Sequence, residues 1–427
     1  MKKYKISIKL AIILVMTLGL LIPSFLIQEL IRERSYTNLE AAQEIASKWG
    51  KEQMISTPVL GFEKTSVELF DKQLQTIYSK YILCLEKSES KITVKPQIKK
   101  RGIFETVVYE SDISIKGNFS LESIHNLQTT KGTIIKHTAE CALFVSDLEA
   151  LVDNPEVSIN GEIIKLSKLN IQNEILSFEL PVSDSAAEMN FSIRFKLKGN
   201  KQIELIPNGL KNKIELESHW NTVSYIGTKL PDSHTEKEKL ANAYWQNVRP
   251  KFQSGNPDEF TNFTQFFDRP ANTLGASFII PVDQYQLVTR AAKYAIMFIV
   301  LTFTAFFFIE ILNKKRIHPV QYLLVSIALL LFYTLLLSFS EQIGFNAAYG
   351  ISALAIVALI SMYTRAILKS GKHAGITALS LSALYGFLYI LLQLETYALI
   401  AGSLGLFIVL AVLMYVSRKV DWYGEES

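Results

Sequence analysis

Six long apolar runs constrain the fold of this chain more than any other feature of its sequence. Each run is about 20 residues long, which at 1.5 Å per residue matches the ~30 Å hydrocarbon core of a bilayer. The sequence therefore predicts a membrane α-helical protein with six transmembrane helices. The predicted spans are Leu10–Ile27, Ala291–Leu312, Val320–Ser340, Phe345–Thr364, Ala374–Gln393 and Tyr397–Ser417.

The runs are unevenly spaced, because a long polar block separates the first from the second. This block holds 31 basic and 33 acidic residues, so it is close to neutral and gives no indication of nucleic-acid binding. The expected organisation is a tail at 1–9, an anchor helix at 10–31, the polar domain at 32–290, a five-helix bundle at 291–417 and a second tail at 418–427.

The first apolar run has two interpretations. Its charged start and apolar middle are typical of a secretory signal peptide, which would be removed. However, the run is longer than the usual apolar region of such a peptide, and no small-residue cleavage pattern follows it. It continues instead through IPSFLIQELIRER, which favours an uncleaved anchor helix that extends into water.

The distribution of Lys and Arg predicts the orientation. Twelve of these residues lie in the N-terminal tail, in two loops of the bundle and after the last span, whereas the turns EQIGFN and LET hold none. Cytoplasmic loops carry the basic excess in membrane proteins. We therefore expect both termini in the cytoplasm and the polar block on the outside.

The polar block is predicted to be β-rich. Short runs with alternating polarity recur from about Gly61 onward, without long helices between them, which favours an antiparallel sandwich or a barrel-like sheet. Asn160–Gly161 predicts a tight hairpin turn, and KGNKQ at 198–202 suggests a second. A short helix is expected around Lys237–Trp245.

Cys84 and Cys141 both lie in the polar block. In an oxidising outer compartment they could form a disulfide. The alternative is two separate buried thiols, because the sequence does not show whether their Cα atoms lie within bonding distance. Both interpretations stay open at the level of sequence.

Motifs of common enzymes are absent from the sequence, including H-E-x-x-H, C-x-x-C, G-x-x-x-x-G-K and G-x-S-x-G. His219, His234 and Asp232 could form a metal or acid–base site, but they are more typical of ordinary loop residues. The sequence therefore predicts no enzymatic activity, no cofactor and no metal.

Charged residues near the spans have simple explanations. We expect Glu310 to pair with Lys314 one turn later, and Glu341 to lie in water just past a helix end. Lys293 lies close enough to its helix end to reach water. Without an acidic residue in mid-span, the sequence does not favour a proton-coupled transporter.

The segment PVDQYQLVTRAAKY, residues 281–294, leads from the polar block into the second span. It predicts either a helix that continues straight into the span and couples the two domains, or a solvated entry turn with interfacial Tyr and Arg. In the helical interpretation, Asp283 lies in the first turn, where a carboxylate is favourable. The composition supports both equally.

This segment, together with RIHPVQYLLVSIALLLFYTLLLSFSEQIGF, LLIPSFLIQELIRER and RKVDWYGE, closely resembles the CreD family of bacterial inner-membrane proteins. The resemblance implies a multi-pass inner-membrane protein with a periplasmic domain, linked to cell envelope integrity, the stress response to β-lactams, and colicin tolerance. It implies no catalytic residue. The motif positions carried over, of unstated role, are Asp283, Gln284, Tyr285, Gln286, Arg290, Lys293, Tyr294, His318, Pro319, Gln321 and Tyr322.

Three classes of function follow from these features. The first is a non-enzymatic membrane protein whose outer domain binds an envelope protein or cell-wall component. The second is a transporter or lipid-handling protein that uses the C-terminal helix bundle in the lipid bilayer. The third, a membrane enzyme, is disfavoured by the scattered histidines. The oligomeric state is not indicated by the sequence.

Overall fold

The computed structural model describes residues 2–70, 73–122, 124, 133–135, 138–164, 169–181, 187–220, 222–237, 240–248, 258–260, 262–268, 272–280, 284–312, 317–394 and 397–418. It divides into two compact units. The helical unit comprises Met1–Leu39 and Val282–Ser427, and the β unit comprises Glu40–Pro281. The boundaries differ from the expected 32 and 290, because the end of the polar block contributes a helix to the helical unit.

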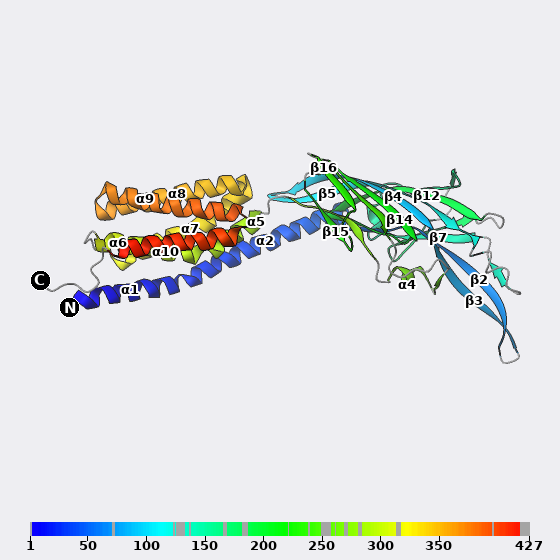
Figure 1. Ribbon diagram of the computed structural model, residues 1–427, viewed down its shortest axis with the longest axis horizontal. Coiled ribbons are helices and arrows are strands. Elements are labelled where there is room, and N and C mark those ends of the chain that lie inside the picture. The colour runs from blue at the N-terminus through cyan, green and yellow to red at the C-terminus, as the bar shows by residue number, and fades with distance from the viewer. Residues whose placement is uncertain are drawn as a thin grey trace. The chain divides into compact units, whose positions relative to one another are not determined.

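The helical unit is built from helices, most of which are long (Figure 1). They are α1 (Lys2–Gly19), α2 (Leu21–Trp49, of which the part before Glu40 belongs here), α5 (Gln284–Lys293), α6 (Ala295–Leu312), α7 (Pro319–Ile343), α8 (Phe345–Leu368), α9 (Gly371–Gln393) and α10 (Ala398–Ser417). Among the described residues, five helices are long and apolar enough to cross a membrane. They are the continuous stretch Ala11–Trp49, which takes in part of α1 and all of α2, and the helices α7, α8, α9 and α10. A sixth span results if α5 and α6 count as one, although they meet at a bend of 44°.

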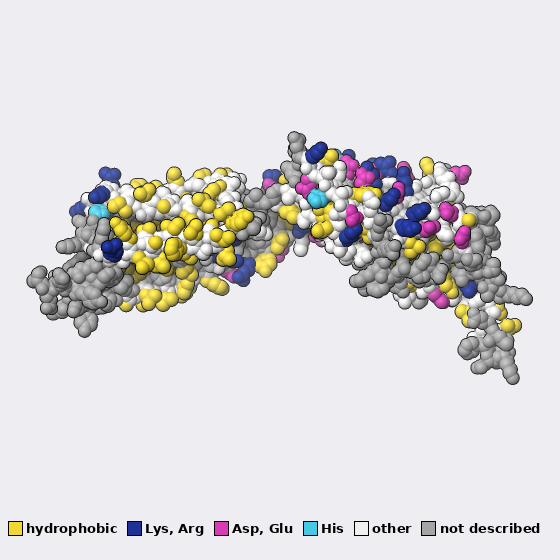
Figure 2. Space-filling model, viewed as in Figure 1, with side chains coloured by type: hydrophobic (Ala, Val, Ile, Leu, Met, Phe, Trp, Pro, Cys, Tyr) yellow, Lys and Arg dark blue, Asp and Glu magenta, His cyan; other side chains and the backbone are white. Residues whose placement is uncertain are grey.

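Aromatic residues pack the centre of this unit. Phe332 of α7 contacts Tyr349 of α8 and Tyr385 of α9, with ring centres 5.4 Å and 4.6 Å apart, and Phe298 of α6 contacts Tyr385. Outside this centre, hydrophobic side chains gather on the visible surface of the helices (Figure 2). An apolar surface of this kind is expected where lipid replaces water as the solvent.

The β unit contains three sheets (Figure 1). Its strands are β1 (Gln53–Ser56), β2 (Val59–Phe70), β3 (Gln73–Cys84), β4 (Lys87–Arg101), β5 (Phe104–Ser120), β6 (Thr133–Ile135), β7 (Thr138–Phe144), β8 (Glu156–Ile159), β9 (Glu162–Ile164), β10 (Asn170–Gln172), β11 (Ile175–Pro181), β12 (Glu188–Asn200), β13 (Gln202–Ile206), β14 (Lys211–Ser218), β15 (Val223–Gly227), β16 (Ser233–Lys237), β17 (Leu240–Val248), β18 (Asp258–Glu259) and β19 (Leu274–Phe278). The short helices are η1 (Leu148–Ala150) and α4 (Phe263–Phe267).

The sheets differ in size but share one core. Their strand orders are β1-β13-β19-β15, β10-β11-β7-β2-β3-β18 with β6 beside β2, and β16-β17-β14-β4-β5-β12-β8-β9. Leu60, Ile113 and Ile203, from the three different sheets, belong to the same buried hydrophobic cluster. Alternate residues of β4 and β12 are buried, as the period of two predicts for strands with one solvated face. The expected β-rich domain is therefore confirmed.

Local predictions in this unit had mixed outcomes. The hairpin at Asn160–Gly161 is confirmed: both residues have positive φ, and they join the paired strands β8 and β9. The hairpin at KGNKQ is wrong, because β12 and β13 belong to different sheets and the chain crosses between them there. The helix at Lys237–Trp245 is also wrong, because β17 pairs with both β14 and β16, and these partners override the helical pattern.

The end of α2 is anchored in the β unit by Trp49. Its indole N–H donates to the carbonyl of Tyr109, and the Lys99 and Lys198 ammonium groups lie 4.8 Å and 4.7 Å from the ring centre. Such contacts combine hydrogen bonding with cation–π attraction. The helix ends at Trp49, just before Gly50, whose positive φ favours glycine.

Cys84 and Cys141 do not form a disulfide with each other. They lie on β3 and β7, which pair with β2 on its two sides, opposite Val59 and Leu60 respectively. Because successive residues of a strand face opposite sides, the two thiols lie on opposite faces of the sheet. Two strand spacings of about 4.8 Å also exceed the usual Cα separation of a disulfide. The structure favours the alternative of two separate thiols.

Candidate functional site

The family-like segment forms α5, an amphipathic helix that packs inside the helical unit. Tyr285, Val288, Ala291 and Ala292 are buried, whereas Gln286 is exposed and Gln284 is half-buried. Neither interpretation of this segment holds in full: it is helical, but it bends by 44° before α6 rather than continuing straight. Asp283 lies outside the described residues.

Tyr285 contributes to a polar cluster that sequence reasoning missed. Glu341 of α7 accepts two hydrogen bonds from the Arg34 guanidinium, at 3.1 Å and 2.9 Å, and one from the Tyr285 hydroxyl at 3.0 Å. Its side chain is only 6% exposed. The prediction that Glu341 lies in water is therefore wrong. The cluster joins α2, α5 and α7. In the sequence it was indicated only by the charges of Arg34 and Glu341, each on a helix that also carries a long apolar run.

The last turn of α5 contacts the end of another helix. The Arg290 guanidinium donates to the carbonyl of Leu394 at 3.1 Å, at the C-terminal cap of α9. Helix C-termini leave carbonyl groups without intrahelical partners, and they attract cations. Lys293 is exposed, as expected for a lysine that reaches water, and Tyr294 lies at the bend itself. Arg290 thus links α5 to α9.

The second motif, His318–Tyr322, starts α7. The ring Nδ1 of His318 accepts from the backbone of Val320, and Gln321 Oε1 accepts from the backbone of His318 at 2.9 Å. This reciprocal pattern is a capping box. Pro319 occupies the first helical turn, where its missing N–H costs nothing. Helix initiation explains the residue types at these three motif positions.

Tyr322, the last motif position, contacts a buried acid. Glu310 of α6 accepts a hydrogen bond from the Tyr322 hydroxyl and another from the backbone of Ile317, both at 3.1 Å. Glu310 is 6% exposed. The expected partner, Lys314, lies outside the described residues. These contacts connect the end of α6 to the start of α7.

Two residues considered above for a metal or acid–base site, Asp232 and His234, make separate local contacts. Within the described part of the chain, no group of three or more His, Cys, Asp or Glu side chains is placed to hold a metal ion. Asp232 accepts from the backbone of Gln246 and from Lys229, and these hydrogen bonds lower the pKa of its carboxyl. His234 instead packs against Tyr225, with ring centres 5.5 Å apart.

The β unit has a cavity of about 860 Å³ on one face of its seven-stranded sheet. Glu63, Glu140 and Glu179 line it from three strands, and α4 covers it with Phe263. Phe263 packs directly over Gly61, where a Cβ would collide with its ring. The carboxylates in this lining could accept hydrogen bonds from a partner, and the aromatic rings could contact its apolar parts.

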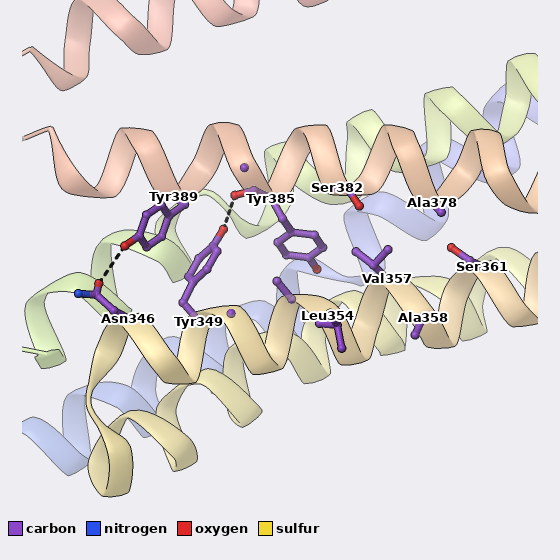
Figure 3. Close-up of a pocket in the computed structure, with 13 residues that line it drawn as sticks. Asn346, Tyr349, Leu354, Val357, Ala358, Ser361, Ala378, Ser382, Tyr385 and Tyr389 are labelled. Atoms are coloured by element: carbon purple, nitrogen blue, oxygen red, sulfur yellow. Dashed lines mark hydrogen bonds between the residues drawn. The ribbon is translucent and has the colours of Figure 1, made fainter.

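The helical unit has a groove of about 620 Å³ between α8 and α9 (Figure 3). Tyr349, Tyr385 and Tyr389 lie toward one end of it, and Ser361 toward the other. Most of the lining is apolar or small. Gly350 of α8 also lines this groove, and a Cβ there would meet nothing within 4 Å.

Comparisons with known proteins identify the family of the chain. The family model described as inner membrane protein CreD matches residues 5–423. Inner membrane protein CreD of Escherichia coli (strain K12) is 30% identical over 419 residues, which cover 95% of this chain and 91% of that protein.

Solved structures give only weak likeness. An M1 zinc metallopeptidase from Deinococcus radiodurans aligns with 50% of this chain and 53% of its own, at 6% identity and a TM-score of 0.21. Legionella pneumophila aminopeptidase A aligns with 46% of this chain and 21% of its own, at 8% identity and the same TM-score. Scores this low carry no argument about fold or activity.

Proposed function

The chain belongs to the CreD family of inner membrane proteins, and on that premise we propose that it crosses the membrane six times, with both termini in the cytoplasm and the β unit in the periplasm. The five apolar helices and the bent pair α5–α6 supply the six spans. Twelve Lys and Arg residues on the proposed inner side, against none in the two outer turns, support the orientation.

The function that these features support best is non-enzymatic maintenance of the cell envelope. In this proposal the β unit binds an envelope protein or cell-wall component, and the helical unit anchors it. The observation that carries the proposal is the large β-rich unit inserted between the first and second spans. The 860 Å³ cavity offers it a binding surface. Tolerance to colicins and β-lactams is the phenotype that the resemblance implies.

The alternative, a lipid-handling protein, has one observation in its favour. The groove between α8 and α9 is apolar and lies on helices that are proposed to contact lipid. An aqueous transport path would instead require polar side chains along a water-filled route. One protein can both maintain the envelope and bind lipid. The groove is therefore consistent with the proposal of envelope maintenance.

Reporter fusions test the orientation. Fusions after Gly50 and Lys211 should report a periplasmic location, and fusions after Lys315, Lys372 and the C-terminus a cytoplasmic one. A cytoplasmic result at Lys211 would overturn the orientation and, with it, the periplasmic partner. Mixed results among the last three would contradict the six-span count but not the location of the β unit.

Photo-crosslinking in cells tests the partner. A photoreactive amino acid at Glu179, in the cavity, should give a specific adduct in the full-length protein. The matched control is Lys213, which is exposed in the eight-stranded sheet. Equal adducts from both positions, or none from Glu179, would contradict binding at the cavity.

A further inference from the structure

We propose that the groove between α8 and α9 binds one acyl chain of a phospholipid, with the glycerol end of that lipid at Asn346 and Tyr389. This proposal goes beyond envelope maintenance and rests only on the part that places the helical unit in the bilayer. The groove is defined by side chains of two neighbouring helices (Figure 3).

Two glycines in the lining, one on each helix, leave part of the groove unfilled. A Cβ added at Gly350 of α8 or at Gly386 of α9 would meet nothing within 4 Å. Leu354, which also lines the groove, is 74% exposed, so the groove opens to the surroundings of the helix. In a bilayer those surroundings are lipid chains. Empty space beside them forfeits dispersion contacts that a chain would supply.

The dimensions of the groove select its occupant. Asn346 and Ser361 lie at its two ends, which at 1.5 Å per residue are about 22 Å apart. A volume of about 620 Å³ over that length gives a mean cross-section of about 28 Å². Even the volume of about 1110 Å³ that includes the open mouth gives only about 50 Å².

A helix needs more room than this. With a diameter of 10–12 Å, a helix of a partner or of a second copy occupies roughly 80–110 Å². A single extended hydrocarbon chain is roughly 4–5 Å across at ordinary carbon contact distances, or about 20 Å². The groove therefore matches the width of one acyl chain, whereas a helix lying on it would keep part of its cross-section outside.

Polar groups at one end of the groove determine which end of the lipid lies there. Asn346 Oδ1 accepts hydrogen bonds from the Tyr389 hydroxyl at 3.3 Å and from Gln393 Nε2 at 3.0 Å. Asn346 is exposed, and with its Oδ1 engaged its amide N–H groups can serve as donors. Ester carbonyls of a phospholipid accept hydrogen bonds, while its chains do not. An apolar groove with polar groups at one end thus matches one lipid chain and its glycerol linkage.

The test is photo-crosslinking in vesicles of phosphatidylethanolamine and phosphatidylglycerol. Full-length protein is reconstituted with a phospholipid that carries a diazirine in one acyl chain, and labelled residues are mapped by mass spectrometry. Labelling should concentrate on groove residues of α8 and α9. Leu379 of α9 provides the internal comparison, because it is 74% exposed and outside the groove.

Two matched variants sharpen the test. Gly386→Leu adds a side chain to the groove at a position where a Cβ would meet nothing within 4 Å, and it should reduce groove labelling fivefold or more. Gly375→Leu, on the same helix, also has open space around it but lies outside the groove, and it should leave the labelling unchanged. Both replace a helical glycine by a better helix former, so neither is expected to unfold the protein.

Three results would overturn the proposal. Equal labelling of Leu379 and the groove would show only annular lipid. Unchanged labelling in Gly386→Leu would show that the groove is not the labelled site. Absence of groove labelling, with crosslinks between copies after Ser361→Cys, would place a protein helix there. In the first two cases the protein would still be membrane-embedded, so the proposed topology would stand.

Discussion

At the scale of single residues, buried polar contacts hold the helical unit together where apolar packing alone would leave the helices interchangeable. Arg34, Tyr285 and Glu341 join α2, α5 and α7, and the contact between Tyr322 and Glu310 joins α6 to α7. Removing one member of such a cluster leaves the others with unmet hydrogen-bonding capacity, which costs more than the pair contributes. These contacts therefore specify which helices are neighbours.

Arg34→Ala should destabilise the helical unit by about 1–3 kcal/mol, because it leaves the carboxylate of Glu341 buried without its cation. The control, Arg32→Ala, removes an exposed i,i+3 pair with Glu29 on the same helix and should change stability by less than about 0.5 kcal/mol. Thermal unfolding in detergent, followed by helix circular dichroism, measures both. Equal effects of the two substitutions would refute the structural role of the cluster.

Asp112 offers a pH-dependent contribution in the β unit. The hydrogen bond from Arg194 lowers the pKa of Asp112, so its folded-state pKa lies below the unfolded value of about 3.9. The pair therefore stabilises the protein above about pH 4 and loses this contribution as the pH falls through the folded-state pKa. Asp112→Asn should cost about 0.2–1 kcal/mol at pH 7, because the pair is partly exposed, and almost nothing near pH 2.

Denaturant unfolding of the parent and the variant between pH 2 and 7 checks this dependence. Asp153→Asn, at an exposed aspartate of the same unit, serves as the control for the loss of a surface carboxylate. A difference between Asp112→Asn and the parent that persists at pH 2 would mean that the residue acts through packing rather than through its charge.

At the scale of elements, the sequence was most informative where one pattern covers a whole helix or strand. The apolar helices, the strand β5 and the Asn160–Gly161 turn all follow from local patterns. Predictions failed where contacts with residues distant in sequence determine the local structure or the burial of a side chain. Sheet neighbours make a strand of β17, and β13 joins a different sheet from β12. The burial of Glu341 depends on Arg34, which no local pattern could link to it.

The start of α7 gives an element-scale prediction. Gln321→Ala removes half of the capping box and should destabilise the helical unit by about 0.5–2 kcal/mol. Gln342→Ala replaces an exposed glutamine at the other end of α7 and should have little effect. Hydrogen exchange of the first turn of α7 measures the local change. Equal exchange in both variants would mean that the cap does not stabilise the helix start.

At the scale of the whole molecule, the two units have separate cores and different solvents under the proposed topology. Three of the four tryptophans, Trp49, Trp220 and Trp245, lie in the β unit, so tryptophan fluorescence reports mainly on that unit. Helix circular dichroism reports mainly on the other. Two probes can therefore follow the two units in one sample of full-length protein.

Gly275→Ala should destabilise the β unit selectively. A Cβ at Gly275 would collide with the backbone of Ile203 on the neighbouring strand, and such overpacking typically costs about 1–3 kcal/mol. The fluorescence transition should shift to lower temperature, while the helical transition stays in place. Gly375→Ala, in open space on α9, should leave the fluorescence transition unchanged. A shift of both transitions in Gly275→Ala would show that the two units unfold as one.

The topology of the four-stranded sheet also determines when this protein can finish folding. Gln53 in β1 pairs with Ile203 in β13, and Ile203 pairs in turn with Ala276 in β19. β1 must therefore wait for β13, and the sheet is complete only after β19, near the end of the unit, has been synthesised. Pairing over such sequence distances is slow. Until then its edges are exposed to other chains, a state prone to aggregation. Synthesis is therefore a stage at which this domain is exposed to aggregation.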